Sequence, residues 1–285
     1  MPPAKGRDKA ALVISHPGHE LCVHHWLETA RPDVFVLTDG SGRSGISRLD
    51  STTKIIASAG ASAATIYGRF TDPDIYAALL QRDFGLFERL VMELAETFVR
   101  TQIECVAGDA VEGYNPIHDA CRLVIDAAVG IAGRMSGRRI VNRDFLLFGR
   151  HDSHPEEVRA SAIWLTLDED AFARKLAVAR MYPELRNEVE AALDKKKIEA
   201  LRRYPELSAQ VDRLTDAMGS DAYRVECLRL VSEPAKANRP DKEVPFYERY
   251  GELLVAAGVY QHAIRYREHV APLADAIRRF ADARH

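Results

Sequence analysis

The chain is poor in cysteine, with four in 285 residues, and no two of them are close together in the sequence. Cys22, Cys105, Cys121 and Cys227 form no Cys-x-x-Cys pair, which excludes the common zinc-ribbon and thiol-oxidoreductase motifs. All four lie in apolar stretches that we expect in helices or strands. This usage indicates buried, reduced thiols and a cytoplasmic protein.

The sequence also lacks long apolar runs. None approaches the ~18 residues that a membrane-spanning helix needs, so we expect no membrane partner. The first ten residues, MPPAKGRDKA, contain neither the apolar core nor the small-residue cleavage site of a signal peptide.

No strong excess of charge of one sign is present. The net charge is −3 and the sequence pI is about 6.4. The run Lys195-Lys196-Lys197 is short and lies in a charged stretch, which is typical of a solvated helix face. A nucleic-acid partner, which would require clustered Lys and Arg, is therefore not expected.

Short apolar runs alternate with helical stretches over the first two thirds of the chain. We predict strands at 11–15, 34–39, 64–70, 103–108, 138–149 and 160–167. We predict helices at 19–30, 48–60, 75–100 and 118–133. This alternation is typical of a Rossmann-like α/β fold, with a mostly parallel sheet and helices on both faces.

After residue 168 the sequence becomes charged and helical in character. We predict a catalytic α/β domain over 1–182 and a helical region over 183–285 that completes and caps it. The sequence YPEL occurs at 182–185 and again at 204–207, and we interpret both as helix starts with an early proline. The tail is rich in Tyr and Arg. It is either a cap over the site or a subunit contact that would make a homo-oligomer.

Two histidines follow the first predicted strand. His16 and His19 are separated by Pro17 and Gly18. In open parallel sheets, ligands bind at the carboxyl ends of strands, so both imidazoles are placed where a ligand would bind. The pair alone is equally compatible with a polar turn.

A third histidine strengthens the metal interpretation. His118 follows the fourth predicted strand, where a loop meets a helix. Strands one and four are expected to be neighbours across the switch point of the sheet. Three converging imidazoles would match a catalytic zinc site, which leaves one coordination position for water.

The motifs at this edge of the sheet resemble those of the PIG-L/LmbE-like metal-dependent N-deacetylases. That family has His-Pro-Asp-Asp-x-Glu or His-Pro-Asp-Asp-Glu after its first strand, and this chain has HPGHE at 16–20. The family's second strand ends in Thr-Asp-Gly before a glycine-rich loop, as here at 38–45. Its last motif, His-Pro-Asp-His, matches NPIH at 115–118.

Further positions agree in order and spacing. Arg48 and Gly60 match an arginine that opens a helix and a glycine that ends it, and Asp72 matches an aspartate after the third strand. The stretch 174–182 resembles a later lysine-containing helix. The resemblance covers roughly residues 10–182 and implies a metal-dependent hydrolase that cleaves an N-acyl bond on a small polar substrate, such as an N-acyl amino sugar or conjugate.

The resemblance implies a metal site made by His16, His19 and His118. His19 stands where the family has its metal-binding aspartate. Imidazole is also a good zinc ligand, so zinc is the expected cofactor, with other divalent transition metals as alternatives. Replacing a carboxylate by an imidazole leaves the site one unit more positive and weakens its affinity for harder metals.

The departures affect catalysis. Gly18 occupies the position of the family's general base, and glycine accepts no proton. Another group would have to accept it, and we predict Asp39 first, with Glu20, Glu112 and Asp119 as further candidates. Glu20 is alternatively a group that orients a histidine, and Asp119 could have that role for His118. Side chains predicted to bind the substrate are Arg48, Asp72, Tyr114 and Asn115.

Two alternatives stay open. The first is a non-catalytic family member that binds a metal or ligand after losing its base. The second is a dinucleotide-binding oxidoreductase, because GSGRSG at 40–45 fits Gly-x-Gly-x-x-Gly. That fingerprint belongs after the first strand of such sheets, however, and here it follows the second.

Overall fold

A computed structural model of the chain describes residues 9–42, 44–148, 156–186, 189, 204–207, 220–231 and 244–284. The lysine run 195–197 and Arg43 of the glycine-rich loop lie outside these residues. Within the described ranges, none of the helices combines the length and the apolar character that crossing a bilayer requires.

The core of the molecule is a seven-stranded sheet in the order β3-β2-β1-β4-β5-β7-β6. Its strands are β1 (Ala10–Ile14), β2 (Asp33–Thr38), β3 (Ser62–Phe70), β4 (Cys105–Asp109), β5 (Val141–Phe145), β6 (Ile163–Thr166) and β7 (Val225–Leu230). The strands β1 to β5 pair in parallel, whereas β7 is antiparallel to both β5 and β6. The predicted α/β fold with a mostly parallel sheet is confirmed.

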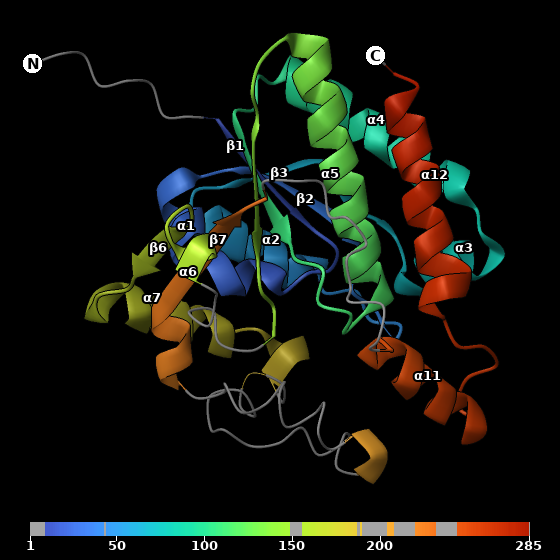
Figure 1. Cartoon of the computed structure of the whole chain (residues 1–285). Helices are drawn as coiled ribbons and strands as arrows, with labels where there is room; N and C mark the ends of the chain where they lie inside the picture. The colour runs from blue at the N-terminus through green and yellow to red at the C-terminus, as the bar shows by residue number, and fades with distance from the viewer. Residues whose placement is uncertain are drawn as a thin grey trace, which may run out of the picture.

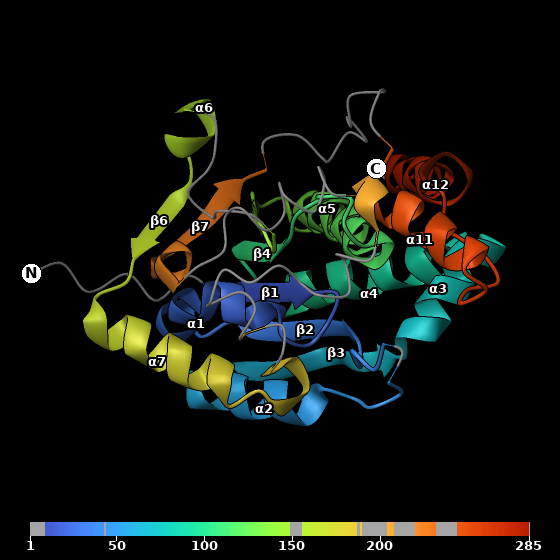
Figure 2. The same ribbon diagram turned by 90° about the horizontal axis from the view of Figure 1, so that it is seen from below.

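Helices cover both faces of the sheet (Figures 1 and 2). They are α1 (His24–Ala30), α2 (Leu49–Ser58), α3 (Asp72–Gln81), α4 (Phe84–Arg100), α5 (Pro116–Ser136), α6 (Glu156–Arg159), α7 (Glu169–Arg180), α11 (Phe246–Ala256) and α12 (Ala271–Asp282). The described residues also form the short 3-10 helices η1 (His19–Val23), η2 (Pro183–Leu185), η3 (Pro205–Leu207) and η4 (Ser220–Arg224). A π-helical turn, η5 (Tyr266–Val270), precedes α12.

Alternation along the central strand produces two hydrophobic layers. In β1, Ala11 and Val13 face the layer formed with α4, α5 and α12, whereas Leu12 and Ile14 face the layer formed with α1 and α2. All five residues of β1 are buried. A strand that is buried on both faces reads as a continuous apolar run, which is why AALVI was recognisable in the sequence.

Two predictions about secondary structure were wrong. The single helix predicted over 75–100 is two helices, because Arg82 adopts the left-handed conformation at φ 56° and the Asp83 side chain caps the start of α4. The charged region after residue 168 was predicted to be helical, yet 225–230 is the strand β7. Its central residues are buried between β5 and β6.

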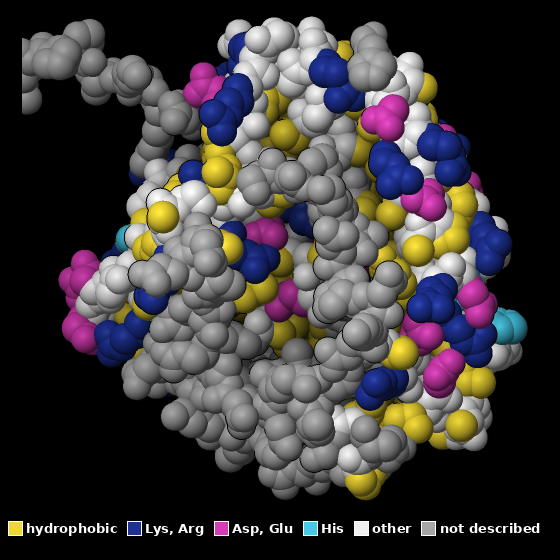
Figure 3. Space-filling model, viewed as in Figure 1, with side chains coloured by type: hydrophobic (Ala, Val, Ile, Leu, Met, Phe, Trp, Pro, Cys, Tyr) yellow, Lys and Arg dark blue, Asp and Glu magenta, His cyan; other side chains and the backbone are white. Residues whose placement is uncertain are grey.

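The C-terminal region is built into the main core. Helix α12 packs on α4 and α5, with Leu273 and Ile277 in the same hydrophobic layer as β1. The two YPEL copies both form short 3-10 turns, η2 and η3. On the face shown in Figure 3, Lys and Arg side chains are interspersed with Asp and Glu over the C-terminal helices.

A buried ion pair fastens β7 to the helices on one face. Lys175 Nζ lies 2.8 Å from Glu226 Oε1, and their side chains are 3% and 0% exposed. The Glu226 carboxylate also accepts the backbone N–H groups of His25 and Trp26. It therefore satisfies donors at the N-terminus of α1, where a negative charge is favoured by the helix dipole.

We expect Lys175→Met to lower the free energy of unfolding by about 3–5 kcal/mol, because it leaves the Glu226 carboxylate buried without its cation. Arg174→Met is the matched control. Arg174 is the preceding residue, is 53% exposed and pairs with Glu28, so its loss should cost less than about 1 kcal/mol. Urea denaturation measures both, and equal costs would contradict the prediction.

Candidate metal centre

The candidate site lies at the carboxyl ends of four adjacent strands. His16 and His19 follow β1, Thr38 ends β2, and Asp109 ends β4. Asp72 follows β3 as the first residue of α3. The chain crosses from one side of β1 to the other between β3 and β4, so this edge is the switch point of the sheet.

The three predicted histidines lie in contact with one another. The ring centroids are 5.4 Å apart for His16 and His19, 5.0 Å for His16 and His118, and 4.6 Å for His19 and His118. His118 reaches the cluster from the first turn of α5. The structure therefore brings together side chains that are about a hundred positions apart in the sequence.

The hydrogen bonds of His16 fix its tautomer. Its Nδ1 lies 2.8 Å from Thr38 Oγ1 and 3.0 Å from Asp72 Oδ1. The Thr38 hydroxyl donates its own proton to the carbonyl of Ser15, and a carboxylate only accepts. His16 must therefore carry its proton on Nδ1, which leaves a lone pair on Nε2. That atom is buried and has no partner among the described residues.

His19 has the same arrangement. Its Nδ1 lies 3.1 Å and 3.0 Å from the two oxygens of Asp109. Asp109 is fully buried and also accepts the backbone N–H and the hydroxyl of Ser15, at 2.8 and 2.6 Å. With a carboxylate on Nδ1, His19 donates there and leaves its Nε2 lone pair for another partner.

The protonation states favour neutral imidazoles beside ionised carboxylates. Burial lowers the pKa of His16, and burial together with the neighbouring imidazoles lowers the pKa of His118 well below its ordinary value. Burial opposes ionisation of Asp72, yet the hydrogen bond from His16 helps to hold its pKa at about 2. Burial also opposes ionisation of Asp109, but contacts with His19 and Ser15 keep its pKa below the ordinary value.

The donor set fits a metal ion, although the rings stand edge to face. In the described part of the chain, no group of three or more His, Cys, Asp or Glu has its donor atoms arranged ready to hold a metal. The chemistry is nevertheless suitable. Neutral imidazole is a zinc ligand, and His16 Nε2 and His118 Nδ1 are buried atoms without a partner among the described residues. A carboxylate on the far nitrogen is the usual partner of a metal-binding histidine.

Asp109 is the site residue that sequence reasoning missed. The predicted fourth strand stopped at Gly108, one position short. The signal was present, because an aspartate that ends a buried strand next to β1 lies at the carboxyl edge of the sheet.

Asp72, predicted to bind substrate, lies at this same carboxyl edge, after β3. Its oxygens are engaged by His16 and by the backbone N–H of Gly42 at 2.7 Å.

Gly18 adopts a backbone conformation that suits glycine, with φ 108°. A Cβ placed there would lie 2.4 Å from Leu185 Cδ1, so the space of a side chain at this position is filled. Both oxygens of Glu20 are engaged by groups other than the rings. Its Oε2 accepts the Gly18 N–H at 2.7 Å and its Oε1 accepts the Thr52 hydroxyl at 2.7 Å, and burial raises its pKa.

Asp39 and Arg48 lie close together beyond the end of β2. Asp39 Oδ1 accepts the N–H and hydroxyl of Ser41 at 2.9 and 2.6 Å, and its backbone carbonyl accepts the Arg48 N–H at 2.8 Å. Within the described residues, Asp39 Oδ2 and the Arg48 guanidinium make no hydrogen bond or ion pair.

The glycine-rich loop is attached to the histidine cluster by a hydrogen bond from Gly42 to Asp72. It follows β2, and the N–H of Gly42, which would face a pyrophosphate in a dinucleotide fingerprint, donates to Asp72.

Tyr114 and Asn115 border the cluster on the α5 side. The Tyr114 ring lies 6.5 Å from that of His118, 3.6 Å from Phe148 and 5.0 Å from Phe246, centroid to centroid. Asn115 caps α5, because its Oδ1 accepts the N–H of Ile117 at 2.8 Å. An aromatic wall, with Phe246 supplied by α11, therefore adjoins the histidines.

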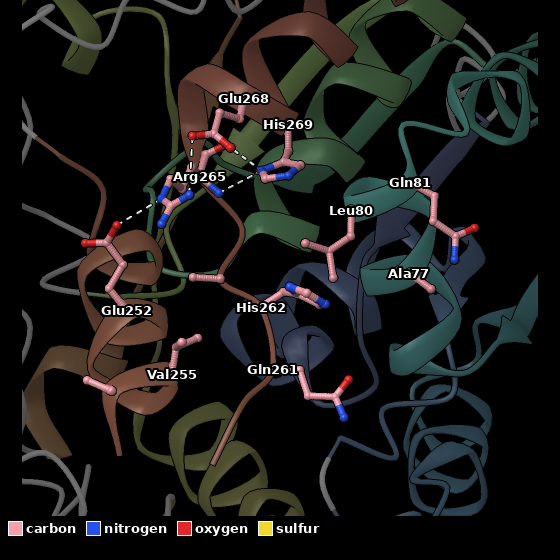
Figure 4. Close-up of a pocket in the computed structure, with 12 residues that line it drawn as sticks. Ala77, Leu80, Gln81, Glu252, Val255, Gln261, His262, Arg265, Glu268 and His269 are labelled. Atoms are coloured by element: carbon pink, nitrogen blue, oxygen red, sulfur yellow. Dashed lines mark hydrogen bonds and ion pairs between the residues drawn. The ribbon is translucent and has the colours of Figure 1, made fainter. Parts of the chain in front are cut away.

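A separate pocket lies between α3, α11 and the segment 261–269 (Figure 4). Its volume is about 720 Å³. Arg265 lies 3.0 Å from Glu252 and 3.3 Å from Glu268, and its backbone N–H donates to His269 Nδ1 at 2.9 Å. These charged side chains are paired with one another. None of the three clustered histidines lines this pocket, which is therefore distinct from the histidine cluster.

The chain resembles solved deacetylases. It is 18% identical to the A40926 pseudoaglycone deacetylase Dbv21, with a TM-score of 0.49 over 79% of this chain and 97% of that one. The zinc-inhibited form of the teicoplanin deacetylase Orf2 is 14% identical, with a TM-score of 0.47 over 78% and 97%. The conserved protein TT1542 from Thermus thermophilus is 19% identical, with a TM-score of 0.47 over 79% and 95%.

No family model and no curated protein matches the chain. Identities and TM-scores at this level are too low to transfer a function.

Glu112, one of the further acidic candidates, holds the loop before α5 in place. Its carboxyl accepts the N–H groups of Leu147 and Phe148 at 2.7 and 3.1 Å, and burial raises its pKa to about 8. Asp119 accepts the backbone N–H groups of Glu112 and Gly113. Both carboxyls are thus engaged with backbone rather than with the rings.

A group whose pKa is higher in the folded than in the unfolded state stabilises the fold. This stabilisation is complete below the unfolded-state pKa and is lost as pH rises through the folded-state pKa. We therefore expect the free energy of unfolding to fall between about pH 4.5 and 8, by on the order of 4 kcal/mol from Glu112. Glu112→Gln, which does not titrate, should remove this part of the fall. Urea midpoints across that pH range measure it, and an unchanged slope in the variant would contradict the prediction.

Proposed function

We propose that the chain is a metal-dependent hydrolase that cleaves an N-acyl amide bond on a small polar substrate, such as an N-acyl amino sugar or conjugate. One observation carries the proposal. Two histidines in mutual contact, His16 and His19, each donate Nδ1–H to a buried carboxylate and keep Nε2 for another partner. A simple polar turn has no need for this double pairing, whereas metal-binding histidines commonly have it.

The residues proposed to hold the metal are His16, His19 and His118, with zinc as the preferred ion. Three neutral imidazoles suit zinc and similar transition metals better than magnesium or calcium, which prefer oxygen ligands. A bound zinc ion would polarise the acyl carbonyl and lower the pKa of a water molecule to about 7. Asp72 and Asp109 orient two of the imidazoles and make them more basic.

Asp39 is the acid best placed to accept the proton of the attacking water. It follows β2 directly after Thr38, which touches His16, and one of its oxygens stays unengaged within the described residues. Glu20 is less suitable, since both of its oxygens already accept hydrogen bonds, one from the Gly18 N–H and one from the Thr52 hydroxyl. General-base catalysis typically contributes 10²–10⁴-fold to the rate.

Substrate binding is assigned to groups around the same edge. The Arg48 guanidinium can bind an anionic or hydroxyl group beside Asp39. Tyr114 presents the edge of the aromatic wall next to His118. Asp72 already accepts a hydrogen bond from His16, and Asn115 already caps α5. We therefore expect these two residues to support the site more than to bind the ligand.

A non-catalytic function is the second candidate, and it rests on Gly18. The position matching the family's general base carries no side chain, and Leu185 fills its space. A chain that had lost catalysis could bind metal and substrate without releasing product. Product release therefore separates this candidate from the hydrolase.

Metal content tests the donor set directly. We expect purified wild type to retain about one zinc per chain after dialysis, and His19→Ala to lose most of it. Asp109→Asn should weaken zinc affinity by about 10–100-fold, because it removes the partner of His19 Nδ1. His25→Ala, on α1 beside Glu28, is the control and should retain its metal. Elemental mass spectrometry gives the stoichiometry, and a metal-free wild type after zinc loading would overturn the metal site.

Hydrolysis tests the reaction. A panel of N-acyl amino sugars should release the corresponding acid, and both a chelator and His118→Ala should abolish the release. Asp39→Asn should lower kcat by about 10²–10⁴-fold. Full activity of Asp39→Asn would discard the base assignment but keep the metal role. Metal binding without any release of acid would favour the non-catalytic candidate.

A further inference from the structure

A buried chain of hydrogen bonds connects the loop of His16 and His19 to a residue far along the sequence. The Gly18 N–H donates to Glu20, the Thr52 hydroxyl donates to the other oxygen of Glu20, and Tyr182 Oη lies 2.9 Å from Thr52 Oγ1. Glu20, Thr52 and Tyr182 are each 0% exposed. The network therefore has no solvent to replace a missing member.

The Tyr182 hydroxyl also closes the far end of this network. Because the Thr52 proton goes to Glu20, Tyr182 donates its own proton to Thr52 Oγ1, and the backbone carbonyl of Arg48, 3.3 Å away where α2 begins, is a second acceptor for that same proton. Tyr182 therefore binds the first turn of α2 through Thr52 and Arg48 together. Through Glu20 it determines where the backbone between the two histidines can lie.

Leu185 makes the second contact with the same loop. Its Cδ1 would lie 2.4 Å from a Cβ on Gly18, so it occupies the space that any side chain at that position would need. Leu185 packs with Leu21, Ile55 and Tyr182 in a small hydrophobic cluster. The loop is thus held both by a hydrogen bond to Glu20 and by contact with the apolar side chain of Leu185.

The segment that carries both residues is itself fastened to α2. It follows α7 and forms the turn η2 (Pro183–Leu185). Within it, Glu184 accepts the Ser51 hydroxyl through both oxygens, at 3.1 and 2.8 Å. The position of Tyr182 and Leu185 is therefore fixed independently of the histidine loop.

We propose that Tyr182 and Leu185 are positioning residues that hold the His16–His19 loop in the conformation that binds the metal. The part of this inference that concerns metal rests on the proposed function. The part that concerns the conformation of the loop does not, because it can be read on the metal-free protein. Neither residue is assigned contact with substrate.

The first test is Tyr182→Phe, which keeps the ring and removes only the hydroxyl. Tyr67→Phe is a closely matched control. Tyr67 Oη lies 3.0 Å from Thr53 Oγ1 on the same helix, but it has no hydrogen bond into the histidine loop in the described structure. We expect Tyr182→Phe to weaken zinc affinity by about tenfold, and Tyr67→Phe to leave it unchanged, in a competition titration with a chromophoric chelator.

A second readout needs no metal. The ring nitrogen resonances of His16 and His19 report tautomer and ring environment in the chelator-treated protein. Tyr182→Phe should shift or broaden them, and Tyr67→Phe should not. Unchanged resonances together with unchanged zinc affinity would overturn the inference. If wild type binds no zinc, the proposed function fails, and the resonances alone decide the positioning role.

The contact of Leu185 is tested by a double-mutant cycle. Gly18→Ala alone should weaken zinc affinity more than Leu185→Ala alone, because it adds both a collision and a strained φ. The double variant should recover part of the affinity lost by Gly18→Ala, since the shortened side chain makes room. Strictly additive effects, measured by zinc affinity and by the same histidine resonances, would show that Leu185 does not act through the loop.

Discussion

The candidate site depends on one interaction, the hydrogen bonding of a fully buried carboxylate at the end of β4. Asp109 accepts the backbone and side chain of Ser15 as well as His19. It therefore joins the adjacent ends of β1 and β4 and orients an imidazole at once. Such a carboxylate is stable in the interior only because three donors replace its water. The orientation of the His19 ring follows from its hydrogen bond to Asp109, and that of the His16 ring follows from its hydrogen bond to Asp72.

The succession of strands β1 to β5 along the chain, and the position of His16 and His118 after two of them, could be predicted because these signals are local. AALVI is buried on both faces and shows as an apolar run, and His16 and His118 stand next to proline-marked turns. The break at Arg82 could not be predicted in this way, since arginine rarely adopts positive φ and the helical pattern continues on both sides. The pairing of β7 was hidden too, because its charged residues find partners only in the folded sheet.

The same reasoning explains what the sequence did not reveal about the site. Asp109 and Glu20 acquire their roles from residues that are far away in the chain. Asp109 needs β1 beside it, and Glu20 needs Thr52 and Tyr182. A carboxylate that holds a histidine and one that holds a backbone loop look alike in sequence. Their partners, an imidazole for Asp109 and a backbone N–H for Glu20, are set by the packed structure alone.

The antiparallel strand β7 has a consequence for how the chain folds. It lies between β5 and β6, although it follows β6 by about sixty positions in the sequence. During synthesis, β5 is therefore an open sheet edge until β7 emerges, several seconds later at ~5–20 residues per second. β6 meanwhile has no strand to pair with. An exposed edge of this kind is a site for wrong pairing with another chain. Truncation before residue 225 would make that state permanent, even though it leaves all three histidines, Asp72 and Asp109 in place.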